Sequence, residues 1–489
     1  MTHPTAHSHR PRILFRTAGA FLAVWLQCAA AALGPPTAMV SSVSTTAARP
    51  GLAFGTARPV EKARGDVLTL EQAFQAALLG SRDLEAARDR LFEADIDLDR
   101  AWSTLRPSAS VVASVTRHDE EVRFMQADGT ERLVQRLYQP NISASLRQNI
   151  FQGSAAPTLR AVREVRAATK LDERHLRTEV LYAVAGVFYS ALAMQDGLRL
   201  AERQLEDTAA HLDVVRARVE FDAANRLDLL RAQTDHRAAA EDVRVARSSL
   251  DSLKIALATL IGRPRDEGEF NLASPEPLTV EQPAPEQAVR SAIEERDDLA
   301  SLDQRVTAAD HLVTASRMAF LPSLDLAGSA RYSPVATFLR DDQLTWQAVL
   351  SLNIPIYQGR LRRQQLESAH VRARQARRAR ESLEDRVRQE VLQGYLSLET
   401  ATAQLERLSG TAELAKEMLE LARARYEVGA ATSLDVTDAT TRAFVAETQV
   451  LGARLDLDMA VLSLARALGA FDELADLYIT RSGVDSTEG

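Results

Sequence analysis

The amino-acid sequence predicts a mainly α-helical protein built from two internal repeats, each a helix–β-hairpin–helix unit. Two long segments carry apolar residues at spacings that alternate between four and three, which is the heptad pattern of coiled-coil helices. The two heptads share one register at an interval of 207 residues, which indicates an internal duplication. Each long segment follows two short ones in which apolar and polar residues alternate, as in half-buried β-strands.

The composition favours long helices over a packed α/β enzyme. Aromatic residues make up only 5% of the 489 residues, while hydrophobic residues reach 46% and charged residues 26%, as in Ala- and Leu-rich helical proteins. The formal net charge of −8 disfavours a general nucleic-acid binder, because such proteins carry an excess of basic residues.

Residues 1–33 have the features of a cleaved export signal. Three arginines precede an apolar run from Ala18 to Leu33, and small residues follow it. A retained membrane anchor is the alternative, although the run is shorter than the about 20 residues that a spanning helix needs. Lipidation of Cys28 is a second alternative, which the residues before it disfavour. Beyond Cys28 the chain has no cysteine, so no disulfide framework is expected.

The first repeat is predicted at residues 66–262, after a flexible leader at 34–65 that is rich in Ala, Thr, Ser and Pro. A helix is expected from Thr69 to Leu105, because a capping residue begins it and Pro107 follows it. Strands are expected at 108–116 and 141–150, joined by a polar loop with the turn signal Asp128-Gly129.

A very long helix then extends from Ser154 to Phe221, and a returning helix ends near Ile261. At about 1.5 Å per residue the first of these spans roughly 100 Å. A short tip at 222–225 joins them. The heptad positions are Val180, Val184, Val187, Ala191, Met194, Leu198, Ala201, Leu205, Thr208, Leu212, Val215 and Val219.

The same order recurs after a Pro- and acid-rich connector at 263–285. The second repeat is predicted at 286–471, and residues 472–489 form a tail. It has a helix from about Pro285 to Phe320, strands at 324–331 and 345–354, and a second long helix. The heptad positions of that helix are Val387, Val391, Gly394, Leu398, Ala401, Leu405, Leu408, Ala412, Ala415, Leu419, Ala422 and Tyr426.

The four strands leave two interpretations open. By themselves they fit a soluble sheet with one wet face, but about ten residues is also the length of a tilted membrane-spanning strand. No later segment has the about 18 consecutive apolar residues of a transmembrane helix. If the strands lie in lipid, the sheet must close, and four strands are too few for a barrel. Oligomerisation follows from that premise.

Several motifs together resemble the TolC-like outer-membrane efflux channel family over residues 69–471. They are the duplicated unit, the stretches QNIFQGS (Gln148–Ser154) and IPIYQGR (Ile354–Arg360), and the tip RARYEVGAATSLDVTDA (Arg423–Ala439). The resemblance implies a homotrimer whose strands form one twelve-stranded barrel in outer-membrane lipid, above a helical tunnel in the periplasm. It also implies two partners, a periplasmic adaptor protein and an inner-membrane pump.

Enzymatic function is not expected. The six histidines after the leader (His118, His175, His211, His236, His311 and His370) have no metal-ligand spacing, and no nucleotide-binding glycine pattern is present. We therefore expect no catalytic residue, no metal and no cofactor, and a passive conduit driven by a partner.

The resemblance assigns the gate to the tip of the second repeat, where Gly429 ends one helix and Thr432 or Ser433 begins the next. Asp435 and Asp438 match the family's two inward-facing acids, and three copies of each would form rings that favour cations. Asp435 has a second interpretation, compatible with the first, as the acid of a capping box with Thr432.

The first tip differs from the second at two positions. It has Asp228 where the second tip has Asp435, but Arg231 where the second has Asp438. Asp222 stands where the family has glycine, so the turn is expected to differ in shape. Tyr426 and Asp228 match a hydrogen-bonded latch of the family.

One expected latch residue is missing, because Ala431 replaces the family's tip arginine.

The leading prediction is an outer-membrane channel of a tripartite efflux or type I secretion system, gated at its periplasmic tip. Two alternatives stay open, a periplasmic coiled-coil scaffold without a pore and an outer-membrane lipoprotein. Drugs, metals and proteins are equally compatible cargoes.

Overall fold

A computed structural model describes residues 67–125, 129, 131–222, 224–263, 270–275, 283–333, 344–471 and 475. The predicted signal segment with Cys28 and the leader lie outside the described residues, as does the predicted tail apart from residue 475. All elements described below belong to one unit, Arg64–Gly489.

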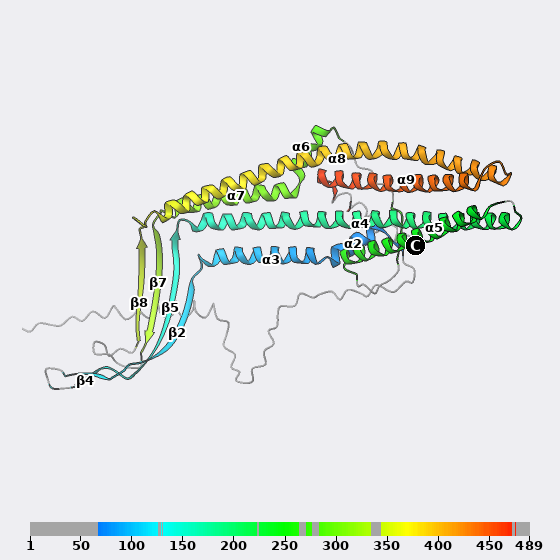
Figure 1. Ribbon diagram of the computed structural model, residues 1–489. Coiled ribbons are helices and arrows are strands. Elements are labelled where there is room, and N and C mark those ends of the chain that lie inside the picture. The colour runs from blue at the N-terminus through cyan, green and yellow to red at the C-terminus, as the bar shows by residue number, and fades with distance from the viewer. Residues whose placement is uncertain are drawn as a thin grey trace, which may run out of the picture. The chain divides into compact units, whose positions relative to one another are not determined.

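Both halves of the chain contain the same elements in the same order, which confirms the predicted fold class (Figure 1). The first half comprises α2 (Leu70–Gly80), α3 (Arg82–Ser103), β2 (Ser108–Arg117), β5 (Tyr138–Gln152), α4 (Ala155–Glu220) and α5 (Arg226–Leu260). The second comprises α6 (Pro285–Glu295), α7 (Asp297–Met318), β7 (Ser323–Tyr332), β8 (Leu344–Asn353), α8 (Leu361–Glu427) and α9 (Ser433–Leu468).

Two predicted helices are each broken in two. The helix expected from Thr69 to Leu105 is interrupted at Ser81, and the helix expected from Pro285 to Phe320 is interrupted at Arg296. Both residues have extended backbone, with ψ of 121° and 126°. The first break carries a local signal that the periodicity masked, because Gly80 ends α2 and Ser81 is the N-cap residue of α3. The break at Arg296 carries no Gly, Pro or N-cap residue type, so tertiary packing overrides helical periodicity there.

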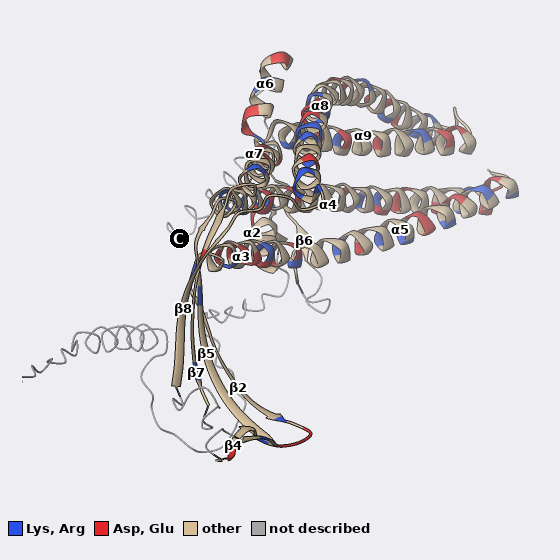
Figure 2. Ribbon diagram, turned by 90° about the vertical axis from the view of Figure 1, so that its left-hand side faces the viewer, with Lys and Arg blue, Asp and Glu red and all other residues tan. Residues whose placement is uncertain are grey.

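The four long strands form one antiparallel sheet in the order β2–β5–β7–β8. Its register pairs Ser110 with Ser145, Ala144 with Ala330, and Leu326 with Leu350. Figure 2 shows that these strands carry few charged residues, whereas the helices are densely charged. Low charge on both faces suits a sheet that meets an apolar medium.

Two smaller pieces of sheet were not predicted. The expected polar loop contains a hairpin of β3 (Val122–Met125) and β4 (Glu131–Gln135), with Gly129 at φ 81° in its turn. In the expected connector, β6 (Asn271–Leu272) pairs in parallel with β1 (Val67–Leu68). Both pairings join residues whose own patterns are too short to indicate strands.

The helices next to the sheet repeat its order, because α3 packs on α4, α4 on α7 and α7 on α8. Further from the sheet, α4 pairs with α5 and α8 with α9 to form two long hairpins. None of the predicted heptad positions of α4 and α8 is exposed. The largest core gathers where α2, α4, α5 and α9 meet, around Phe74, Phe188 and Phe471.

No helix in the described part of the chain combines the length and low charge needed to cross a bilayer.

Candidate functional site at the helix tips

The tip of the second hairpin is a tight turn between α8 and α9. The helix α8 ends at Glu427, and Gly429 adopts the left-handed region with φ 75°. The N–H of Ala430 donates to the carbonyl of Arg425 at 2.8 Å, which satisfies one of the last free carbonyls of the helix. The helix α9 then begins at Ser433. The predicted break at Gly429 is therefore present.

Asp435 is the acid of a capping box, as one of its two interpretations predicted. The Thr432 hydroxyl oxygen accepts from the N–H of Asp435 at 3.3 Å. The Asp435 carboxylate accepts from the N–H and the hydroxyl of Thr432, each at 2.7 Å. These bonds lower the pKa of Asp435, so its exposed carboxylate stays ionised.

Asp438 lies one turn further along α9 and faces solvent. Its side chain is 56% exposed and pairs with Arg442 of the same helix at 2.9 Å. An exposed pair of this kind contributes little to stability. Asp438 therefore has no structural role comparable with the cap that Asp435 provides.

The first tip has the same backbone plan. Asp222 is left-handed with φ 55°, so the expected difference from Gly429 in turn shape is not found at this residue. Asn225 caps α5 by accepting from the N–H of Asp228 at 2.9 Å. The side chain of Asp228 faces Arg231 at 3.7 Å. One acid of this tip is thus accompanied by a cation.

The two hairpins touch near their tips through contacts that sequence reasoning missed. The Arg218 guanidinium lies 4.1 Å from the ring centre of the buried Tyr426 and donates to its carbonyl at 2.8 Å. Arg423 pairs with Asp207 at 2.9 Å. These partners lie on different helices more than 200 residues apart, so no spacing rule could have indicated them.

Among the described residues, no hydrogen bond joins Tyr426 to Asp228, whose recorded partners are Asn225 and Arg231. That latch stays a prediction.

A cleft of about 400 Å³ lies between the hairpins, lined by residues of α4, α5, α8 and α9. Besides the Arg423–Asp207 pair, polar contacts between the hairpins here join His211 to the Ser433 hydroxyl at 3.0 Å and Thr437, as donor, to Asp235 at 3.3 Å. Burial lowers the pKa of His211, and the nearby cations Arg423 and Arg218 lower it further against the opposing effect of Asp235. His211 is therefore held neutral in this contact.

The cleft offers no evident metal site. In the described ranges, no three His, Cys, Asp or Glu side chains converge as metal ligands would.

Comparison with known proteins agrees with this architecture. The family model of outer membrane efflux proteins matches residues 73–263 and 288–470, which together make up more than half of the chain. The chain belongs to the outer membrane efflux protein family. Membership confirms the resemblance to TolC-like channels. The chain is an outer-membrane protein whose helical part lies in the periplasm.

Relatives within this family are distant but span most of the chain. The pyoverdine export outer membrane protein OpmQ of Pseudomonas putida is 26% identical over 418 residues, which cover 82% of this chain and 85% of OpmQ. Outer membrane protein TolC of Escherichia coli is 24% identical over 421 residues, which cover 83% of each chain.

Solved structures of outer-membrane channels share the fold. The CmeC channel of Campylobacter jejuni has a TM-score of 0.71 at 16% identity and covers 91% of this chain and 98% of CmeC. The open state of the MtrE channel of Neisseria gonorrhoeae has a TM-score of 0.67 at 22% identity and covers 82% and 88%, respectively.

Proposed function

We propose that this chain is one subunit of a homotrimeric outer-membrane channel, a passive exit duct that is gated at its periplasmic helix tips. In this proposal the duct receives cargo from an inner-membrane pump through a periplasmic adaptor protein, as in a tripartite efflux system. The observation that carries the proposal is the sheet β2–β5–β7–β8, whose outer strands β2 and β8 each lack a second neighbour among the described residues.

Lipid does not tolerate such free edges, because unpaired backbone N–H and C=O groups find no water there. The strands are about as long as a tilted membrane span requires. Large apolar side chains are exposed on both edge strands, with Val111 at 73%, Trp346 at 63% and Leu350 at 64%. Further copies of the sheet, with β8 of one chain beside β2 of the next, would close it into a barrel.

The edge helices also favour assembly with further copies. On α3, Phe92 is 66% exposed among the exposed acids Glu85 and Asp89. On α8, Arg374 and Arg378 are exposed and have no ion-pair partner among the described residues. Since α3 and α8 are the outer helices of the layer, closure brings an acidic face against a basic one.

The gate is assigned to the second tip. Asp435 and Asp438 are both exposed there, and in a trimer three copies of each would form stacked carboxylate rings. The first tip carries Arg231 at the position equivalent to Asp438 and would not form the second ring. This asymmetry supports placing the constriction at α8–α9.

In this proposal the protein is not an enzyme, because a passive duct needs no catalytic group and its partner supplies the energy. The relatives' names mention pyoverdine export, toluene efflux and antibiotic efflux. Such varied cargo favours a duct whose specificity lies with the pump, and type I secretion is the second candidate within the same class.

Reconstitution of the purified protein in planar bilayers tests the proposal. We expect discrete, cation-selective conductance steps and trimers after chemical cross-linking of outer-membrane fractions. A monomer without conductance would instead support the coiled-coil scaffold. Drug or protein retention in a deletion strain separates efflux from type I secretion.

A further inference from the structure

The two repeats contain an equivalent corner that is held together by different chemistry. In each repeat the helix that precedes the strands breaks at one residue, Ser81 in the first and Arg296 in the second. The returning helix of the same repeat ends beside that break, at Gly262 or at Gly469, and both glycines are left-handed with φ 71° and 79°. Each corner is therefore the root of a long hairpin, α4–α5 or α8–α9.

The first corner is a contact of backbone against backbone. A Cβ atom added to Gly80 would lie 2.7 Å from the carbonyl oxygen of Ile261, and a Cβ on Gly262 would meet the backbone of Gly80. Only glycine allows the chains to approach this closely. This contact consists of backbone atoms alone.

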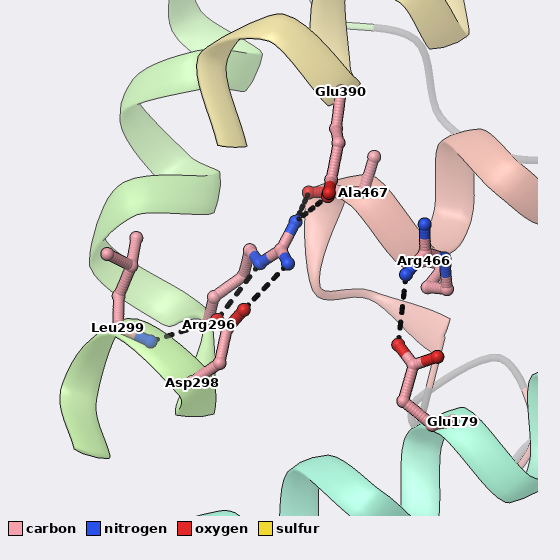
Figure 3. A network of polar contacts seen from close by, with 7 residues as sticks. All are labelled: Glu179, Arg296, Asp298, Leu299, Glu390, Arg466 and Ala467. Carbon is pink, nitrogen blue, oxygen red and sulfur yellow. Dashed lines mark hydrogen bonds and ion pairs between the residues drawn. The ribbon is translucent and has the colours of Figure 1, made fainter. Parts of the chain in front are cut away.

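The second corner is an ion cluster around a buried arginine, drawn in Figure 3. Arg296 is 6% exposed and binds Asp298 with two nitrogens, Nε at 3.1 Å and Nη2 at 2.8 Å. Its Nη1 donates to Glu390 at 2.7 Å and to the carbonyl of Ala467 at 3.3 Å. A Cβ atom on Gly469 would lie 3.2 Å from Cγ of Arg296. One guanidinium thus joins the start of α7, the middle of α8 and the end of α9.

The cluster is ionised and its parts depend on each other. Burial acts against the charge of Arg296, but the bonds to Asp298 and Glu390 outweigh it and raise the pKa of the guanidinium. The pKa of Asp298 is lowered, because Arg296 outweighs the opposite effect of burial. Removing one member would leave a buried charge without its partner, which is costly.

Because this cluster lies at the far end of the hairpin, a small rotation there would displace the tip by a larger distance. The helix α9 has 36 residues, so at about 1.5 Å per residue its first turn lies roughly 50 Å from the corner. A rotation of about 5° at the root would displace the tip by about 4 Å, since displacement grows with helix length. A shift of that size would separate His211 from Ser433 and move Asp435 and Asp438.

We propose that Arg296 is the positioning residue of the gate: it fixes the root of the α8–α9 hairpin and thereby sets where the second tip lies against the first. That the tip is a gate rests on the proposed function, whereas the control of tip position rests on the contacts of Arg296 alone. The first hairpin, held by its glycine corner, is the fixed reference against which the second one moves.

Spin labels at Glu220 and Val428, exposed residues at the two tips, measure this position directly. Cysteines are introduced there in a Cys28→Ser background, and labelled chains are diluted with unlabelled ones so that distances arise within one chain. Arg296→Met removes the cluster, and Glu390→Gln weakens it while keeping a hydrogen-bond acceptor. Arg388→Met is the matched control, because among the described residues Arg388 pairs only with Glu384 and Asp385 of its own helix.

We expect one narrow distance for the parent chain and for Arg388→Met. In both cluster variants the distance distribution should broaden to include a second, longer distance. Their channels should also stay open for longer in planar bilayers. An unchanged narrow distance in a folded, trimeric Glu390→Gln protein would overturn the proposal even if Arg296→Met fails to fold. A parent chain without conductance would refute the channel function, while the label distances would still test Arg296.

Discussion

Asp435 and Asp438 lie three residues apart, yet only one of them has a structural task. The Asp435 carboxylate is occupied by Thr432 at the start of α9, whereas Asp438 has only an exposed partner, Arg442. A substitution at Asp438 should therefore change the charge in the proposed pore without changing the stability of the tip.

We predict that Asp438→Asn lowers the preference for cations and weakens block by multivalent cations, because three carboxylates leave one ring. The melting temperature should stay within about 1 °C, since an exposed pair contributes little. Bilayer reversal potentials and thermal unfolding measure the two effects. Asp97→Asn on α3, where Asp97 also pairs with an arginine of its own helix, is the control. Unchanged selectivity would remove Asp438 from the gate.

Asp222 offers a second test at the residue scale, because it holds a left-handed conformation that its counterpart Gly429 adopts without strain. Asp222→Gly should stabilise the first tip by about 0.5–1 kcal/mol. The reverse change, Gly429→Asp, should destabilise the second tip by a similar amount, although an added Cβ meets no atom within 4 Å. Hydrogen exchange of the tip amides measures both. If backbone strain is the cause, the two substitutions must change the stability of their tips in opposite directions.

At the scale of elements, the tips of the two hairpins meet through few contacts, and one of them titrates. His211 is half-buried beside Ser433, and the pKa of its ring is lowered below the ordinary value of 6.5. In hairpins that have separated, the ring would recover that ordinary value. The separated state therefore binds more protons than the joined state as the pH falls through this range.

Acidification should consequently loosen the tips. As the pH falls from about 7.5 to about 5.5, a larger fraction of the His211 rings would take up a proton. The positive charge is unfavourable in this half-buried position beside Arg423 and Arg218, and Asp235 offsets this only in part. Amides around His211 should exchange faster with solvent at the lower pH after correction for intrinsic rates. His211→Gln keeps a hydrogen-bonding side chain and should abolish this pH dependence. A dependence that survives in the variant would point to another group.

At the scale of the whole molecule, the sheet and the helix layer beside it each have one edge from the first repeat and one from the second. The edges are β2 and β8 in the sheet, and α3 and α8 in the helix layer. The acidic face of α3 and the basic face of α8 therefore predict an ionic seam between neighbouring copies. Such a seam selects its own partner and register more than it adds affinity.

Reversal of the basic edge tests this seam. Arg374→Glu with Arg378→Glu should weaken the trimer by about 1 kcal/mol per seam, because like charges then face Glu85 and Asp89. Adding Glu85→Arg and Asp89→Arg should restore it. The fraction of trimer on non-denaturing gels, measured at low and high salt, reports the effect. Restoration by the fourfold variant must fade with salt if charge is responsible.

Features that depend on short-range physics could be predicted from the amino-acid sequence. Heptad spacing located α4 and α8 and their buried faces, alternation located the four long strands, and the residues around Gly429 and Thr432 located the second tip. Each of these signals arises from neighbours within a few turns, and the repeat at 207 residues supplied each of them twice.

The partners of those buried faces, in contrast, depend on how the whole chain packs. The helix break at Arg296, the contact of Arg218 with Tyr426 and the pairing of β1 with β6 all depend on segments far apart in the chain. A periodic pattern states which side of a helix is buried but not against which partner. The glycine corner and the arginine corner illustrate the reason: equivalent places in two repeats reach the same bend through contacts that no local pattern encodes.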